Sequence, residues 1–345
     1  SIDLMSLDPP FVAEFAEAGF LRPFTESEAE GLTAGVLEGP VEAASWDGLL
    51  MAAPFWANTQ LLWYRRSVAD AAGVDPASDG AMTWDALIAA AEDAEARFDV
   101  QGNLYEGYMV LISALVSSAG GEILKDPEAG KDVTPGIDSD AGRRAAEVIE
   151  HLSHSGAANP GLSTADEEAT RASFQSERGG FMVNWPYVYG AAQEAVADGS
   201  LDQAVLDDIG WARYPRVDSG AESRPPLGGI ALGIGAFGGS TAEALQAVRC
   251  ITSAESQQEY MLSAKNPAAR GAVYDDGEVR RVFPMADLIR DSINDASPRP
   301  KTPYYTDVSS ATVRTFHPPA SVRPDRTPGR AADLIVDVLN DRVLL

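Results

Sequence analysis

Segments patterned as strands alternate with segments patterned as helices along almost the whole chain, and this alternation constrains the fold more than any single motif. The first strand-like run, residues 2–8 (IDLMSLD), is followed at once by helix-spaced apolar residues in 11–21 (FVAEFAEAGFL). A strand that leads directly into a helix is half of a β–α–β unit. Because the alternation continues without repeats or low-complexity tracts, the sequence predicts an α/β fold with mainly parallel sheets.

Apolar spacing, together with glycine and proline, predicts the elements that follow. We expect a helix in 82–98 with Thr83 as its N-cap, and an unusually apolar, buried helix that stops at Gly120. Residues 46–66 predict two strands joined by a turn at 54–58, and residues 224–239 predict a glycine-rich loop. Further helices are expected in 141–156, 165–180, 241–261 and 286–296, and a strand in 181–189.

The length of 345 residues exceeds what one hydrophobic core usually holds, so two lobes are expected. The connector 297–305 (SPRPKTPYY) contains three prolines, which force extended backbone. It is therefore the best hinge candidate that local chemistry offers.

The charge is strongly acidic, with 26 Lys and Arg against 52 Asp and Glu and a net charge of −26. A phosphate backbone or an anionic membrane surface attracts basic proteins, so neither nucleic acid nor a bilayer is expected as a partner. An uncharged ligand suits this charge best. The acidity could equally serve only solubility or reflect a salt-tolerant source.

Several kinds of chemistry lack the residues that they require. Cys250 is the single cysteine, and it is expected in the core because it lies in a stretch with helical spacing. The chain has only three histidines, so no metal or cofactor is expected. No GxSxG motif of a serine hydrolase is present. Residues 233–238 (GIGAFG) formally match a dinucleotide-binding pattern, but they are better explained as a tight strand-to-helix connection.

Neither a membrane span nor a secretion signal can be recognised from the sequence. No run approaches the roughly eighteen apolar residues that a membrane span requires. The start, SIDLMSLDPPF, lacks the basic and apolar regions of a signal peptide. We therefore expect any export signal either to have been removed or never to have been part of this sequence.

Aromatic residues at turns point to sugar binding. A sugar site needs flat aromatic faces for the apolar side of the ring, together with carboxylates, amides and arginine donors for its hydroxyl groups. Five aromatic residues lie in turns that contain proline or glycine, namely Trp56, Trp185, Tyr187, Tyr304 and Tyr305. Each could instead be a buried core aromatic. The same composition also leaves open a glycoside hydrolase with an opposed carboxylate pair.

Six stretches in order along the chain carry a resemblance to a known family: LDPPFVAEFAEAGFLRPF, PFWANTQLLWYRRSV, MTWDALIAAAEDA, FQSERGGFMVNWPYVY, PLGGIALGIG and PRPKTPYYTDVSSATVRTFHP. Together they resemble the carbohydrate-binding proteins of bacterial ABC importers, a family that includes maltose- and trehalose-binding proteins. The NWPYVY and RPKTPYY motifs and the alanine-rich style are most similar to the trehalose-binding lipoproteins of actinobacteria. The family's first strand, which carries part of the site, has no counterpart here, so the site could be incomplete.

The resemblance implies ligand-binding roles for four polar residues. Asp8 and Asn58 would accept hydrogen bonds from sugar hydroxyls, although Asp8 could be only a helix N-cap and Asn58 only a turn residue. Glu167 would accept hydrogen bonds from the sugar, although Glu168 is the alternative if the alignment shifts by one residue. Either glutamate could instead be solvated and interact only with the dipole of its helix. Arg299, between two prolines, would donate a planar fork to neighbouring hydroxyls or form a salt bridge between the lobes.

The resemblance also implies a stacking residue and two glycines at the site. Trp185 would be the stacking platform, because Pro186 ends the strand and turns the indole. Gly228 and Gly229 would allow backbone amides to approach the ligand closely.

The resemblance predicts a two-lobed, type II periplasmic-binding-protein-like α/β fold with a ligand cleft between the lobes. Lobe one is expected in 1–58 and 230–298, and lobe two in 59–229 and 299–345. The expected function is capture of a small carbohydrate, trehalose first, by a monomer outside the cytoplasm. The partners would be the sugar and the membrane permease subunits of an ABC importer, with a lipidated N-terminus as anchor. A glycoside hydrolase and a ligandless scaffold subunit remain the alternatives.

Overall fold

The computed structural model describes residues 2–78 and 80–345, which fold into two compact units. Unit 1 comprises Ser1–Thr59 and Leu227–Tyr305, and unit 2 comprises Gln60–Pro226 and Thr306–Leu345. The chain thus passes between the units three times. Residues 299–305, expected in lobe two, belong to unit 1 because Arg299 and Tyr305 both contact side chains of that unit.

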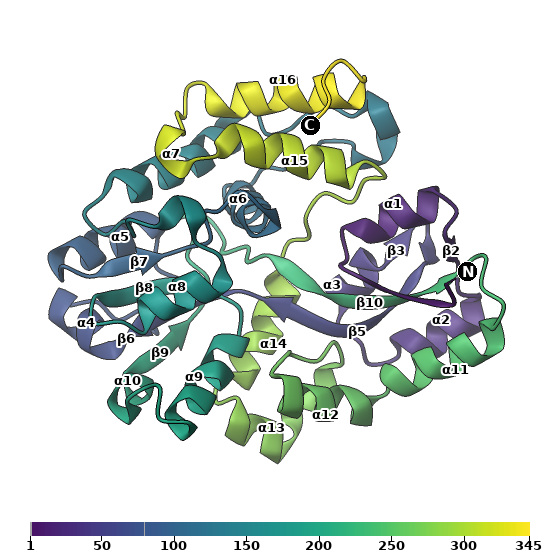
Figure 1. Cartoon of the computed structure of the whole chain (residues 1–345), viewed down its shortest axis with the longest axis horizontal. Helices are drawn as coiled ribbons and strands as arrows, with labels where there is room; N and C mark the ends of the chain where they lie inside the picture. The colour runs from purple at the N-terminus through teal and green to yellow at the C-terminus, as the bar shows by residue number, and fades with distance from the viewer. Residues whose placement is uncertain (1, 79) are drawn as a thin grey trace. The chain divides into compact units, whose positions relative to one another are not determined.

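The sheet of unit 1 is built around β10 (Leu227–Gly235), which pairs with three other strands. These are β1 (Leu4–Leu7), β2 (Leu21–Arg22) and β5 (Ala52–Thr59), and all three run antiparallel to β10 (Figure 1). The expectation of mainly parallel sheets is therefore wrong for this unit. β1 and β5 do point the same way, but β10 comes from much later in the chain and lies between them in the opposite direction.

Two segments expected to be irregular are strands. The expected turn at residues 54–58 lies inside β5, and the expected loop at 224–239 contains β10. The register between β5 and β10 shifts between Ile230 and Ala231, opposite Pro54. A bulge interrupts the hydrogen-bond ladder, so proline is tolerated there although it lacks an N–H group. The second half of the glycine-rich segment does connect β10 to a helix, as the sequence predicts.

Helices and a small hairpin complete unit 1. Its core gathers apolar side chains of β1, β5 and β10 with those of the surrounding helices, among them Val12, Leu32 and Val248. The remaining elements are α1 (Phe11–Glu17), α2 (Glu26–Thr33), α3 (Glu38–Ala43), β3 (Ser45–Trp46), β4 (Leu49–Leu50), α11 (Thr241–Ile251), α12 (Ala254–Ala264), η3 (Gly271–Asp275), α13 (Gly277–Val282) and α14 (Ala286–Asp295).

Unit 2 has a mixed sheet with the strand order β7-β8-β6-β9. The strands are β6 (Leu61–Arg65), β7 (Arg97–Asp99), β8 (Gly179–Asn184) and β9 (Ile209–Ala212). Only β7 and β8 pair in parallel, whereas β6 runs antiparallel to both β8 and β9, so the expectation of mainly parallel sheets is wrong for this unit as well. Helices α4 (Arg66–Ala72), α5 (Trp84–Asp93) and α8 (Glu167–Phe174) pack against this sheet (Figure 1).

The predicted helices of unit 2 are present, but two are shorter than expected: the helix expected in 82–98 ends at Asp93, before β7, and the helix expected in 165–180 ends at Phe174, before β8. Thr83 caps α5 by accepting a hydrogen bond from the amide of Ala86, and α6 (Glu106–Ser118) is almost entirely buried. The other elements are η1 (Pro127–Asp132), α7 (Asp140–His154), η2 (Leu162–Thr164), α9 (Tyr187–Ala197), α10 (Gln203–Asp207), α15 (Tyr305–Phe316), η4 (Pro319–Ser321) and α16 (Thr327–Leu339).

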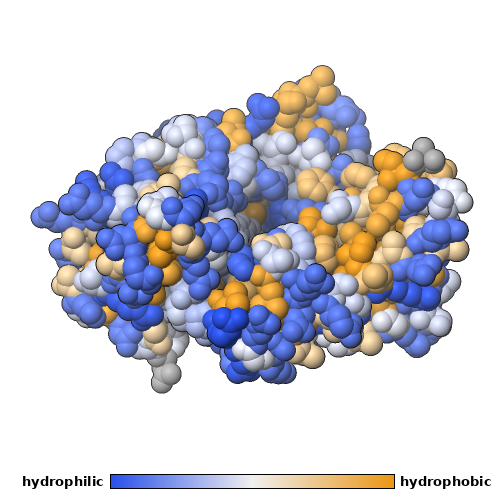
Figure 2. Space-filling view, turned by 60° about the horizontal axis from the view of Figure 1, so that its bottom comes forward, coloured by the Kyte–Doolittle hydropathy of each residue, from blue (hydrophilic) through white to orange (hydrophobic). Residues whose placement is uncertain are grey.

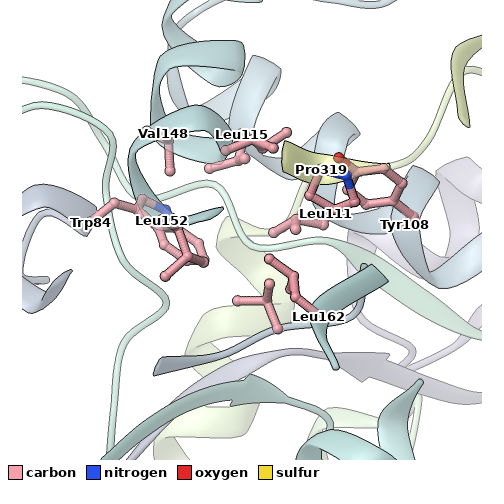
Figure 3. A pocket seen from close by; sticks show the side chains of 10 residues that line it. Trp84, Tyr108, Leu111, Leu115, Val148, Leu152, Leu162 and Pro319 are labelled. Carbon is pink, nitrogen blue, oxygen red and sulfur yellow. The ribbon is translucent and has the colours of Figure 1, made fainter. Parts of the chain in front are cut away.

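A small cavity lies in the core of unit 2 among apolar side chains that include Trp84, Tyr108, Leu111 and Leu152 (Figure 3). Its volume of about 10 Å³ is at the lower limit for a single water molecule. A buried water also needs polar partners, and the lining is apolar. The cavity is therefore a packing void and not a ligand site.

The surface of the protein is largely hydrophilic, as expected from its many charged residues. Hydrophilic residues cover most of the face seen in Figure 2, interrupted by smaller hydrophobic patches. Among the described residues, no helix is both long and apolar enough to cross a membrane.

Cys250, expected in the core, is exposed, because α11 turns Ala244 and Val248 inward and Cys250 lies off that face.

Candidate functional site

Two of the predicted ligand residues of unit 1, Asp8 and Arg299, contact each other. Asp8 follows β1, and its Oδ1 accepts a hydrogen bond of 2.6 Å from an Nη atom of Arg299. The Arg299 side chain is 3% exposed, whereas that of Asp8 is 30% exposed. The alternative of an interlobe salt bridge is wrong for this pair, because both residues belong to unit 1. The buried guanidinium therefore holds the carboxylate, and the carboxylate reaches solvent.

The N-cap alternative for Asp8 is also wrong. Helix α1 begins at Phe11, its N-cap is Pro10, and no side chain caps it. Asp8 contributes only its backbone carbonyl, which accepts from the amide of Phe11.

Tyr305, one of the aromatic candidates, is a core residue. It is fully buried, and its ring packs edge-on against Phe11 with centroids 5.3 Å apart. The Arg299 guanidinium lies 6.0 Å from the centre of the same ring. Tyr305 thus helps to fix Arg299 and is not a free sugar platform.

Asn58 and the two glycines face each other across β5 and β10, where Gly228 pairs with Asn58 and Gly229 with Ala57. Asn58 is 6% exposed, and its Oδ1 accepts from the amide of Thr59 at 3.0 Å. It lies in a strand, so its description as a turn residue is wrong.

Gly229 has a structural reason to be glycine. Its φ of 129° is a region that side chains avoid, and a Cβ there would lie 2.3 Å from the carbonyl oxygen of Trp56. The main chain that approaches this glycine is that of β5.

In unit 2, Glu167 occupies the first turn of α8, as predicted. Asp166 is the N-cap, since its Oδ1 accepts from the amide of Ala169 at 2.8 Å. The carboxylate of Glu167 accepts a hydrogen bond of 2.6 Å from the hydroxyl of Tyr105, which immediately precedes α6. Burial and this carboxylate raise the pKa of Tyr105, so its hydroxyl remains protonated and donates.

Glu168, the alternative to Glu167, is held by two other groups. Its Oε2 accepts from Arg171 at 2.6 Å and its Oε1 accepts from the hydroxyl of Tyr187 at 2.5 Å. The Arg171 guanidinium lowers the pKa of Glu168, and burial raises that of Tyr187. The first turn of α8 thus carries two carboxylates, each paired with a tyrosine.

Trp185 lies between β8, which ends at Asn184, and α9, which begins at Tyr187. Pro186 is the N-cap of α9, so the strand ends before this proline, and residues 187–189, which were expected in the strand, form the first turn of the helix. Trp185 is half-buried, and its amide donates to Oδ1 of Asn184 at 2.8 Å. Because Asn184 also donates to the backbone of Glu167, the structure links Trp185 to the start of α8.

Unit 2 therefore brings together Glu167 and Trp185, with Tyr105 and Tyr187 beside the carboxylates. Carboxylate acceptors, phenol groups and an indole are the groups that bind a neutral polyhydroxylated ring. Among the residues that the structure describes, no three His, Cys, Asp or Glu side chains are placed to hold a metal ion.

Two contributors were missed in the sequence. Tyr105 precedes the most apolar helix of the chain and could have been found by the same criterion of aromatics at element ends. Asn184 carried no signal, because a single amide at the end of a buried strand has no characteristic pattern.

Comparison with known proteins identifies the family. The family described as bacterial extracellular solute-binding protein matches residues 2–258. A relative from Deinococcus radiodurans, described as a probable ABC transporter-binding protein, is 28% identical over 277 residues. That match covers 76% of this chain but only 62% of the relative's length.

Solved structures agree on the fold. Maltose-bound MalE3 of T. maritima is 27% identical, with a TM-score of 0.80 over 99% of this chain and 84% of its own. The GacH receptor of Streptomyces glaucescens, solved unliganded and with acarbose, is 22% identical, with a TM-score of 0.78 over 99% of this chain and 85% of its own.

The family consists of binding proteins rather than enzymes, and its description implies a location outside the cytoplasm. Its α/β architecture also agrees with the solved structures. The chain therefore belongs to the bacterial extracellular solute-binding protein family and has its α/β periplasmic solute-binding protein fold.

Proposed function

We propose that the chain captures a small carbohydrate outside the cytoplasm and delivers it to the membrane permease of an ABC importer. The observation that carries the proposal is the grouping in unit 2 of Glu167, with its Tyr105 partner, and the half-buried Trp185. An acidic protein would repel anionic solutes, whereas a neutral sugar pays no such penalty. The likeness to maltose-bound MalE3 supports the same ligand class.

Trehalose is the first candidate ligand, on the resemblance of NWPYVY and RPKTPYY to the actinobacterial trehalose-binding lipoproteins. On the same resemblance, we propose that a lipid anchors the protein at the cell surface. Within unit 1, Asp8 is the proposed acceptor and Arg299 the residue that orients it, since Arg299 is the more deeply buried of the two.

A thermal-shift screen tests the proposal. Trehalose, maltose, glucose and mannitol are added separately to the purified chain, with glycine, a solute without net charge, at equal osmolarity as the control for general solute effects. A ligand that binds only the folded state adds about 2.7 kcal/mol of stability at a hundredfold excess over Kd. We expect trehalose or maltose to raise Tm, and titration calorimetry to give one site.

Recovery of the sugar after incubation checks that binding is not followed by hydrolysis. Chromatography should return the disaccharide intact. If no sugar of the panel raises Tm or gives heat, carbohydrate capture is wrong for this chain.

A further inference from the structure

One buried side chain, Asn184, holds the backbone of two candidate sugar-binding residues. Its Nδ2 donates to the carbonyl oxygen of Glu167 at 3.0 Å and to Oγ1 of Thr170 at 2.9 Å. Its Oδ1 accepts from the amide of Trp185 at 2.8 Å. The residue is fully buried, so water does not compete for these bonds. The start of α8 and the end of β8 are therefore joined through a single amide.

A second layer of polar side chains supports this amide. Thr170 also donates to the carbonyl of Glu167 at 2.8 Å and accepts from Nε2 of Gln101 at 3.1 Å. Gln101 donates in addition to the carbonyl of Val183 at 3.0 Å. Hydrogen bonds in a network of low local dielectric strengthen one another and fix one arrangement of the groups. The network therefore restricts how α8 can shift against β8.

We propose that Asn184 is the positioning residue that sets the indole of Trp185 relative to the carboxylate of Glu167. The proposal rests on the proposed function, in which both of those residues contact a sugar. Asparagine is required because the position needs a donor toward α8 and an acceptor toward Trp185 on the same planar group. Aspartate keeps the shape and the acceptor but, when ionised, has no donor, and it turns an oxygen toward the Glu167 carbonyl.

The variant Asn184→Asp tests the role because its defect depends on pH. At pH 7.5 the ionised side chain should repel the Glu167 carbonyl and weaken trehalose or maltose affinity about tenfold, the loss expected from one hydrogen bond. At pH 5.5 a buried carboxyl takes up a proton and regains a donor, so most of the affinity should return. The parent protein is measured at both pH values as the control for the other ionisable groups of the neighbouring elements, which are Glu167, Glu168 and Arg171 on α8, Asp99 and Arg97 on β7, Tyr64 and Arg65 on β6, Tyr187 on α9, and Tyr105 before α6.

A ligand-free readout separates this inference from the proposed function. The protein is labelled with 5-fluorotryptophan, and the resonance of Trp185 is assigned with Trp185→Phe. In Asn184→Asp at pH 7.5 the Trp185 resonance should move or broaden, and it should return toward the parent position at pH 5.5. Trp63 donates to the backbone carbonyl of Asn184 and can respond as well, whereas the other four tryptophans should not.

The matched control is Gln257→Glu in unit 1. Gln257 is 1% exposed, donates to the carbonyl of Thr252 and accepts from the amides of Ala269 and Arg270, so the same change places a carboxylate in an equally buried amide site. It should leave the Trp185 resonance unchanged. If Asn184→Asp does not fold, Thr170→Val removes one of the two oxygen atoms that accept from Nδ2 and should shift the same resonance by a smaller amount.

The outcomes are distinct. An unmoved Trp185 resonance in Asn184→Asp and in Thr170→Val overturns the positioning role, whether or not sugar binds. A pH-reversible shift without any sugar binding to the parent supports the positioning role and rejects the proposed function. A shift that is equal in Gln257→Glu marks a general response to buried charge and also overturns the proposal.

Discussion

Asp99 is a buried carboxylate that makes the stability of unit 2 depend on pH. It is the last residue of β7, it is fully buried, and its Oδ1 accepts a hydrogen bond of 2.7 Å from Nδ2 of Asn159. Burial raises its pKa from 3.8 to about 6, against the opposing effects of Asn159, Ser173 and Arg97.

The raised pKa fixes both the sign and the size of the effect. The folded state holds the proton more tightly than the unfolded chain, so the stabilisation is fully present below pH 3.8 and is lost as the pH rises through about 6. A rise from 3.8 to about 6 corresponds to about 3 kcal/mol, because one pKa unit is worth about 1.4 kcal/mol. About half of this loss falls between pH 5 and pH 8.

The variant Asp99→Asn removes the ionisation and keeps an oxygen for Asn159. Its free energy of unfolding, relative to the parent, should therefore rise by about 1.4 kcal/mol between pH 5 and pH 8. Urea denaturation followed by circular dichroism measures both proteins at each pH. Taking the difference cancels carboxylates with lowered pKa, such as Asp85 and Asp208, whose pH dependence has the opposite sign. A difference that stays constant across this range would refute the reasoning.

Three further predictions test the two units separately. Gly229→Ala should destabilise the protein by about 2 kcal/mol or more in urea denaturation, because a Cβ would clash with the β5 main chain. The control Gly31→Ala, on the open face of α2, should stabilise the protein by up to about 1 kcal/mol. Equal stability of the two variants would contradict this prediction. Trp185→Ala should abolish trehalose or maltose binding in calorimetry with little change in Tm, and retained affinity would remove Trp185 from the site. Arg299→Ala should lower the free energy of unfolding by about 2 to 4 kcal/mol and weaken sugar affinity at least tenfold, since it takes the buried partner from Asp8; unchanged stability would contradict the pairing.

Local signals in the sequence were enough to predict most helices. Thr83 at the start of α5 and Pro186 between β8 and α9 act through their own backbone and side-chain chemistry, so their effects are visible without the fold. The same holds for Glu167, which lies in the first turn of α8 as its sequence position predicted.

Features that depend on distant partners could not be predicted in this way. Pro54 indicates a turn by itself, yet it lies in a strand because a bulge beside it in β5 removes the need for its N–H group. The glycines of β10 suggest a loop, but Gly233 leaves room for the side chain of Leu21, which belongs to another strand. Arg299 and Asp8 were each identified as ligand residues, and only the fold shows that one holds the other.

The position of β10 in the chain has a consequence for biosynthesis. β1, β2 and β5 all lie within the first 59 residues and share β10 as their pairing partner, but β10 begins only at Leu227. During translation these three strands are made long before the strand that joins them, while most of unit 2 is made in between. Contacts of such large sequence separation form slowly. The sheet of unit 1 must therefore close late, and until then its strand edges need protection from pairing with other chains.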